Sequence, residues 1–192
     1  DSIQQENWVD LFCSTGMPTF VLDHSKSLST TAQSLARAWI THENTLSDLT
    51  VSKDDIQGWS SQQVQLFLEE FLNHSLPDGV HFSVDILRKL DETYGFTSSQ
   101  NAEVKFRWQM LCLRSSMEDI VPHVVHFITS QGRMKFVRPL YRALGMTKMG
   151  FQPAIDAFQQ FKDSYHPIAR KMLESDLSKI AALYEEESEE SG

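Results

Sequence analysis

Residues 131–140 read Gln-Gly-Arg-Met-Lys-Phe-Val-Arg-Pro-Leu and join two segments with helical patterning. Gly132 is typical of a residue that ends a helix. Phe136, Leu140 and Leu144 then recur at the spacing of a buried helical stripe. The stretch therefore predicts a turn between two packed helices.

Arg133 and Lys135 lie where the second of these helices is expected to begin. A helix N-terminus carries about half a positive charge and several unpaired N–H groups. Two cations beside such an end would form an anion-binding corner. The alternative is two solvated basic residues on a turn, and the residue types alone leave both open.

Helical spacing recurs along most of the chain. The clearest stripe is Val64, Phe67, Leu68, Phe71 and Leu72. No segment shows the sustained period-two alternation of a strand. About nine helices joined by short loops predict an all-α fold of stacked antiparallel helix pairs, an α-solenoid-like (armadillo/HEAT-like) right-handed superhelix.

Several residues mark the ends of these elements. Ser52 and Asp55 form a predicted capping box, Ser83 caps a helix that Gly95 ends, and Gly150 with Pro153 frames a loop. Residues 19–29 lack a clear period and read as a connection, with Thr30 or Thr31 capping the next helix, whose stripe is Leu35, Trp39 and Leu28 or Ile40.

Three regions follow from this pattern. Residues 1–27 are expected to be a leading segment and linker, with a short helix or packed arm around Trp8, and residues 28–183 the helical domain. Residues 184–192 are expected to be an acidic disordered tail, because Glu185, Glu186, Glu187, Glu189 and Glu190 repel one another. Since the chain begins with Asp1 rather than Met, we expect a piece of a longer protein.

Charge and hydropathy limit the kinds of partner that the chain is expected to bind. The 192 residues carry a net charge of −9, which disfavours general binding of nucleic acid. No apolar run approaches the ~18 residues that span a bilayer, so we expect no membrane partner. Cys13 and Cys112 are far apart with apolar neighbours and are interpreted as buried free thiols. These thiols favour an intracellular, cytoplasmic location, with the nucleus or nucleolus as the alternative.

Catalytic motifs do not emerge from the residues. The His42-Glu43 pair lacks the second histidine of a zinc-peptidase motif, because Leu46 stands there. His123 and His126 are three residues apart but have no third ligand nearby, so we interpret them as structural or surface residues. We expect no catalytic residue, no metal site and no cofactor in this chain.

Several stretches of the sequence resemble those of a known protein family. Residues 131–140 closely resemble the C-terminal helical domain of the leukotriene A4 hydrolase, aminopeptidase B and aminopeptidase O family of zinc aminopeptidases. Further matches occur in the same order, and together they cover nearly all of the chain except the acidic end. They are Trp8, Ser14, Gly16 and Pro18 (with a different spacing), Trp39-Ile40, residues 102–108, Glu118-Asp119, Pro122 and His166-Pro167.

The resemblance implies a parent with a β-rich domain, a zinc catalytic domain and this helical domain. The zinc ligands belong to segments that are absent here, so zinc is expected only in the parent. Arg133 and Lys135 match the family residues that bind the substrate carboxylate in the cleft. The hydrolase-like Arg133 combined with a different, acidic ending favours the aminopeptidase O branch.

Two functions follow as hypotheses. The first is a non-catalytic domain of a zinc aminopeptidase, which packs on the parent's own catalytic domain, shapes its cleft and anchors a peptide substrate's carboxylate through Arg133 and Lys135. The second is an α-solenoid protein-interaction scaffold without a catalytic role, since such stacks present extended binding surfaces.

Overall fold

The computed structural model describes residues 26–42, 45, 49–74 and 82–190. All regular structure in these ranges is helical. The α-helices are α2 (Lys26–Thr41), α3 (Ser61–His74), α4 (Val84–Tyr94), α5 (Ala102–Arg114), α6 (Val121–Thr129), α7 (Met134–Gly145), α8 (Phe151–Phe161) and α9 (Pro167–Glu190). Short 3-10 helices are η3 (Lys53–Ile56), η4 (Glu118–Ile120) and η5 (Lys162–Ser164). The predicted all-α class is confirmed.

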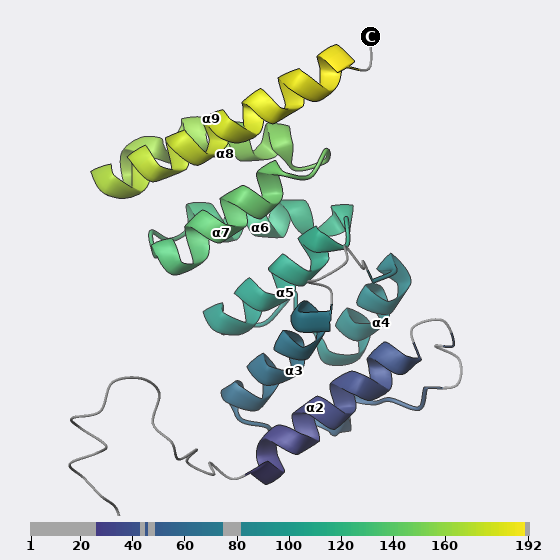
Figure 1. The fold of residues 1–192 in the computed structure, drawn as a ribbon. Helices are drawn as coiled ribbons and strands as arrows, with labels where there is room; N and C mark the ends of the chain where they lie inside the picture. Colours follow the sequence, from purple (N-terminus) through teal and green to yellow (C-terminus); the bar gives the residue numbers. More distant parts are fainter. Residues whose placement is uncertain (1–25, 43–44, 46–48, 75–81, 191–192) are drawn as a thin grey trace, which may run out of the picture.

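The helices stack along one direction (Figure 1). Helices α2, α3, α5, α7 and α9 follow one another, each in contact with the next, and α6 packs against both α7 and α8. One continuous core of buried side chains runs from Ala32 in α2 to Leu177 in α9. This is the stacked-helix arrangement that the sequence predicts, while its right-handed superhelical sense stays a prediction.

Local signals placed several helix ends correctly. The side chain of Ser52 accepts the Asp54 N–H, and the Asp55 carboxylate accepts the Ser52 N–H, as in a capping box. Ser83 accepts the Ile86 N–H at the start of α4. Gly95 ends that helix with φ +70°, a left-handed conformation that glycine adopts without steric cost.

The stripe that the opening stretch predicts is confirmed, because Phe136, Leu140 and Leu144 are fully buried on α7. Gly132, however, does not end the preceding helix. Helix α6 ends at Thr129, and the Ser130 hydroxyl donates to the Phe127 carbonyl at 3.0 Å. A side-chain bond thus satisfies a terminal carbonyl, and no left-handed glycine is needed.

Two other boundaries differ from the prediction. Helix α2 begins at Lys26 rather than after Thr30, and the Gln63 side-chain amide donates to the Leu28 carbonyl in its first turn at 3.4 Å. Gln63 lies on α3, 35 residues from Leu28 in the sequence. Local patterning therefore does not predict where α2 begins. Pro153 lies in the first turn of α8 instead of a loop, where its missing N–H has no intrahelical bond to lose.

The C-terminal prediction is also wrong in part. Helix α9 continues to Glu190, so residues 184–190 are helical rather than disordered. The centroid of the Tyr184 ring lies 4.4 Å from that of the Phe151 ring. This contact stabilises the helical turn at the start of the segment that was expected to be disordered. Glutamate is also among the better helix formers, and this offsets part of the mutual repulsion.

Some predictions fall outside the described ranges: the short helix near Trp8, the break at Pro77 and Gly79, and the state of Cys13. Cys112 is buried and free, as predicted. No helix in the described part of the chain combines the length and the apolar character that a bilayer crossing requires.

Candidate functional site

Arg133 occupies the N-cap position of α7. Its backbone is extended, with φ −73° and ψ 104°, and its carbonyl accepts the N–H groups of Phe136 and Val137 at 2.9 and 3.0 Å. The side chain caps nothing and makes no hydrogen bond or ion pair with the described residues. Arg133 therefore offers its guanidinium to solvent beside the positive end of a twelve-residue helix.

Lys135 lies in the first turn of the same helix, and its ammonium group is held by the Glu103 carboxylate from α5. Glu103 also binds Arg107 at 2.9 Å, and Arg107 binds Glu69 of α3 at 2.6 Å. This chain of charges connects three layers of the stack. The hydrogen bond from Lys135 is the main reason that the pKa of Glu103 lies below its ordinary value.

The Phe136 ring brings the two predicted cations to one corner. The Arg133 guanidinium carbon lies 5.1 Å from the ring centroid, and the Lys135 ammonium nitrogen lies 5.3 Å from it. Both distances are within the range of a cation–π contact. The structure thus places Arg133 and Lys135 together, as the spacing suggested, but only Arg133 lacks an acidic partner among the described residues.

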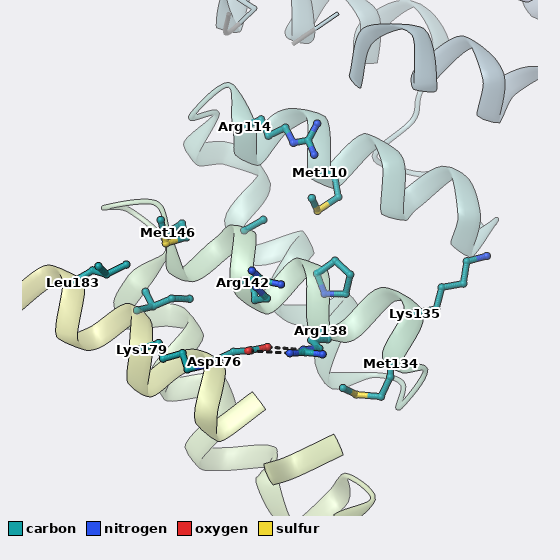
Figure 2. Close-up of a pocket in the computed structure, with 13 residues that line it drawn as sticks. Met110, Arg114, Met134, Lys135, Arg138, Arg142, Met146, Asp176, Lys179 and Leu183 are labelled. Atoms are coloured by element: carbon teal, nitrogen blue, oxygen red, sulfur yellow. Dashed lines mark hydrogen bonds and ion pairs between the residues drawn. The ribbon is translucent and has the colours of Figure 1, made fainter. Parts of the chain in front are cut away.

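A groove of about 900 Å³ extends from Lys135 along α7, with α5 on one side and α9 on the other (Figure 2). Its charged lining consists of five cations and one acid: Arg114, Lys135, Arg138, Arg142, Lys179 and Asp176. The groove is therefore strongly basic although the whole chain carries a net charge of −9.

The acid in this groove is already neutralised. Asp176 accepts hydrogen bonds from the Arg138 Nε at 2.6 Å and from its terminal nitrogen at 3.1 Å. The Arg138 hydrogen bond leads the causes that lower the pKa of Asp176, while Arg142 and Lys179 act on it at longer range. Neither Arg142 nor Lys179 makes a hydrogen bond or ion pair with another described residue, so both charges remain available.

Apolar side chains form the rest of the lining. Met110, Met134 and Met146 come from α5, α7 and the turn after α7, and Leu183 comes from α9. Met146 is 59% exposed and Leu183 is 47% exposed, so this apolar surface is open to solvent. Methionine side chains adapt to ligands of different shape, and here they lie between separated positive charges.

Histidines take no part in this arrangement. His123 and His126 are exposed on α6. Within the described residues no group of three or more His, Cys, Asp or Glu side chains could hold a metal ion. The described residues therefore do not fit a zinc site.

The described part of the chain is thus a stack of helices with a cationic corner and a basic groove. A family model, leukotriene A4 hydrolase, C-terminal, matches residues 59–177. The chain belongs to this family of leukotriene A4 hydrolase C-terminal domains.

Similar proteins agree with this assignment. Leucine aminopeptidase 2 of Emericella nidulans is 34% identical over 175 residues, which are 91% of this chain and 27% of that protein. Leukotriene A-4 hydrolase of Xenopus laevis is 30% identical over 179 residues, 92% of this chain and 28% of its own length. The chain thus spans just over a quarter of these relatives.

The fold comparison reaches the same family. The structure of native yeast LTA4 hydrolase superimposes with a TM-score of 0.78 at 30% identity, covering 92% of this chain and 30% of that one. The relatives include both aminopeptidases and a hydrolase by name, and they do not separate the branches of the family. The expected aminopeptidase O branch therefore stays a prediction.

Sequence reasoning found the corner but missed the groove. Arg138 and Arg142 are one helical turn apart, which a periodicity argument could have used. Glu103, Asp176 and Lys179 are brought in by long-range packing, and no local signal in the sequence predicts their place beside α7.

Proposed function

We propose that this chain is the non-catalytic helical domain of a zinc aminopeptidase, which packs beside the catalytic domain and supplies Arg133 and Lys135 to anchor the carboxylate of a peptide substrate. The observation that carries the proposal is the meeting of both cations over the Phe136 ring at the positive end of α7. Membership in the leukotriene A4 hydrolase family supports the peptidase context.

The corner suits a carboxylate for physical reasons. The Arg133 guanidinium presents a planar set of N–H donors that can bind both oxygens of one carboxylate. The ring beneath it restricts where that guanidinium lies, so less side-chain freedom is lost on binding. Lys135 adds a second positive charge, which a substrate carboxylate shares with Glu103.

The contribution to catalysis is positioning. Holding the far end of a peptide fixes where its scissile bond lies, and such remote binding lowers the barrier at the reacting centre. The zinc chemistry itself belongs to the catalytic domain of the longer enzyme. The intracellular, cytoplasmic location expected from the cysteines stays a prediction.

The test is Arg133→Ala in the longer enzyme that carries this domain. A hydrogen bond to a charged group contributes about 1.5–3 kcal/mol, so kcat/KM for a short peptide should fall about tenfold to a hundredfold. Arg88→Ala on α4 is the matched control, since Arg88 is exposed and paired with Asp119. Equal kcat/KM for the wild type and Arg133→Ala would overturn the proposal.

A further inference from the structure

We infer that the basic groove beside Lys135 is a second anion subsite, formed by Arg142 and Lys179, which selects peptide substrates with an acidic side chain. This inference rests on the proposed function, because it takes Arg133 and Lys135 as the carboxylate anchor. It goes beyond that function by naming a substrate class and the residues that select it.

Continuity of the groove is the first argument. Lys135 belongs to both the corner and the groove, and Figure 2 shows Lys135 at one end with Met146 and Leu183 at the other. Arg142 follows Lys135 by seven residues on α7, which is a rise of ~10 Å along the helix. A ligand anchored at the corner can therefore extend into the groove without crossing a helix.

The available charge is the second argument. Asp176 neutralises Arg138 through two hydrogen bonds, and this pair crosses between α7 and α9. Arg142 and Lys179 have no such partner among the described residues, and they flank the neutral pair. Arg114 also lacks an acidic partner among the described residues, but its guanidinium donates to the Leu72 carbonyl at 3.3 Å. The unmatched positive charge is thus concentrated at the part of the groove that lies away from Lys135.

The apolar lining identifies the occupant as a peptide. Met110, Met134 and Leu183 provide apolar contact area along the groove, which suits a chain that alternates apolar and acidic side chains. A nucleic acid strand is disfavoured because base stacking needs aromatic surfaces, and the groove lining contains none among the described residues. A bare polyphosphate would leave the methionines without a partner.

The distance from Lys135 to Arg142 along α7 predicts where the acidic residue lies in the substrate sequence. An extended peptide advances ~3.3 Å per residue, so ~10 Å corresponds to about three residues. A substrate whose C-terminal carboxylate binds at Arg133 and Lys135 should therefore carry its preferred Glu or Asp three residues before that carboxylate.

The experiment compares two peptides in the longer enzyme. Both have a free C-terminal carboxylate, and they are Ala-Leu-Glu-Leu-Ala-Ala and Ala-Leu-Gln-Leu-Ala-Ala. We expect kcat/KM for the Glu peptide to exceed that for the Gln peptide about tenfold at low salt, with the ratio falling as salt rises. The double variant Arg142→Gln/Lys179→Gln should bring this ratio to about one.

Controls separate the two proposals. Lys89→Gln on α4 removes an exposed cation outside the groove and should leave the ratio unchanged. Arg133→Ala should lower kcat/KM for both peptides equally. If instead Arg133→Ala leaves both values unchanged while the Glu-to-Gln ratio persists, the carboxylate anchor is wrong and the subsite stands. Thermal unfolding of each variant shows whether the fold is retained, and single variants Arg142→Gln and Lys179→Gln replace the double one if it is unstable. Equal kcat/KM for the two peptides in the wild-type enzyme would overturn the subsite, as would a ratio that survives both single substitutions.

Discussion

Arg138 on α7 and Asp176 on α9 are joined by two hydrogen bonds of 2.6 and 3.1 Å, and they connect these two helices across the basic groove. The 38 residues between them make the pair a tertiary contact rather than a local one. Asp176 is mostly buried, so its charge depends on this partner.

The ion pair predicts acid sensitivity. Because the pKa of Asp176 is lowered in the folded state, its contribution to the free energy of unfolding is present above the unfolded pKa of about 4 and is lost as pH falls through the lower folded value. Glu103, whose pKa is also lowered, acts in the same direction.

Urea unfolding at pH 6 and at pH 2.5 should show that Asp176→Asn loses less stability between these values than the wild type does. Asp163→Asn, which affects an exposed pair with Arg170, should behave like the wild type.

The Glu103 carboxylate competes with substrate for Lys135. In the longer enzyme, Glu103→Gln should therefore lower KM for a peptide with a free C-terminal carboxylate about twofold to fivefold, since an exposed ion pair contributes at most about 1 kcal/mol. The same peptide with a C-terminal amide should show no change. A common shift for both peptides would mean that Glu103 acts only on the fold, through its other bond to Arg107.

Two buried tyrosines predict unequal effects of similar substitutions. The Tyr165 hydroxyl donates to the Ile128 carbonyl at 2.9 Å, and the Tyr141 hydroxyl, 3.1 Å away, then donates to Tyr165. Tyr165→Phe leaves a buried donor and a carbonyl without partners, which should cost about 1–3 kcal/mol. Tyr141→Phe removes only the outer donor and should cost about 0.5–1.5 kcal/mol. Chemical denaturation measures both, and a larger loss for Tyr141→Phe would contradict this order of donors.

Buried tyrosines also predict a lower free energy of unfolding at high pH. Burial raises the pKa of Tyr94 and of Tyr141 above the ordinary value of 10, because it disfavours the charged phenolate. The stabilisation is present below the unfolded pKa of about 10 and is lost as pH rises above it. Stability at pH 11 should therefore be lower than at pH 8, and Tyr141→Phe should reduce the difference.

Two glycines provide a matched test of packing. A Cβ at Gly150 would clash with the Leu144 carbonyl oxygen, which is backbone and cannot move alone. Gly150→Ala should therefore destabilise the chain by about 1–3 kcal/mol. At Gly132 the same Cβ would meet no atom within 4 Å, so Gly132→Ala should be neutral or slightly stabilising. Thermal unfolding of both variants tests this difference in stability. Equal stability of the two variants would mean that the turn before α8 rearranges to accommodate the added Cβ.

The sequence by itself determined the class of fold and most helix boundaries. Helical spacing needs only local order, so the stripe of Phe136, Leu140 and Leu144 could be identified before any contact was known. Caps act within four residues, and for that reason Ser52, Ser83 and Gly95 were placed correctly. Arg133 and Lys135 are two residues apart, and one helix start was enough to bring them together.

Only the tertiary structure decided the rest. The start of α2 and the helical acidic end depend on Gln63 and on the ring pair of Tyr184 with Phe151. Local patterning does not predict how far such contacts extend an element. The state of Lys135 depends on Glu103, 32 residues away, and the groove exists because α5, α7 and α9 pack side by side. Whether a cation is free or neutralised is thus a property of packing, since it depends on which charges the fold brings within a few ångströms.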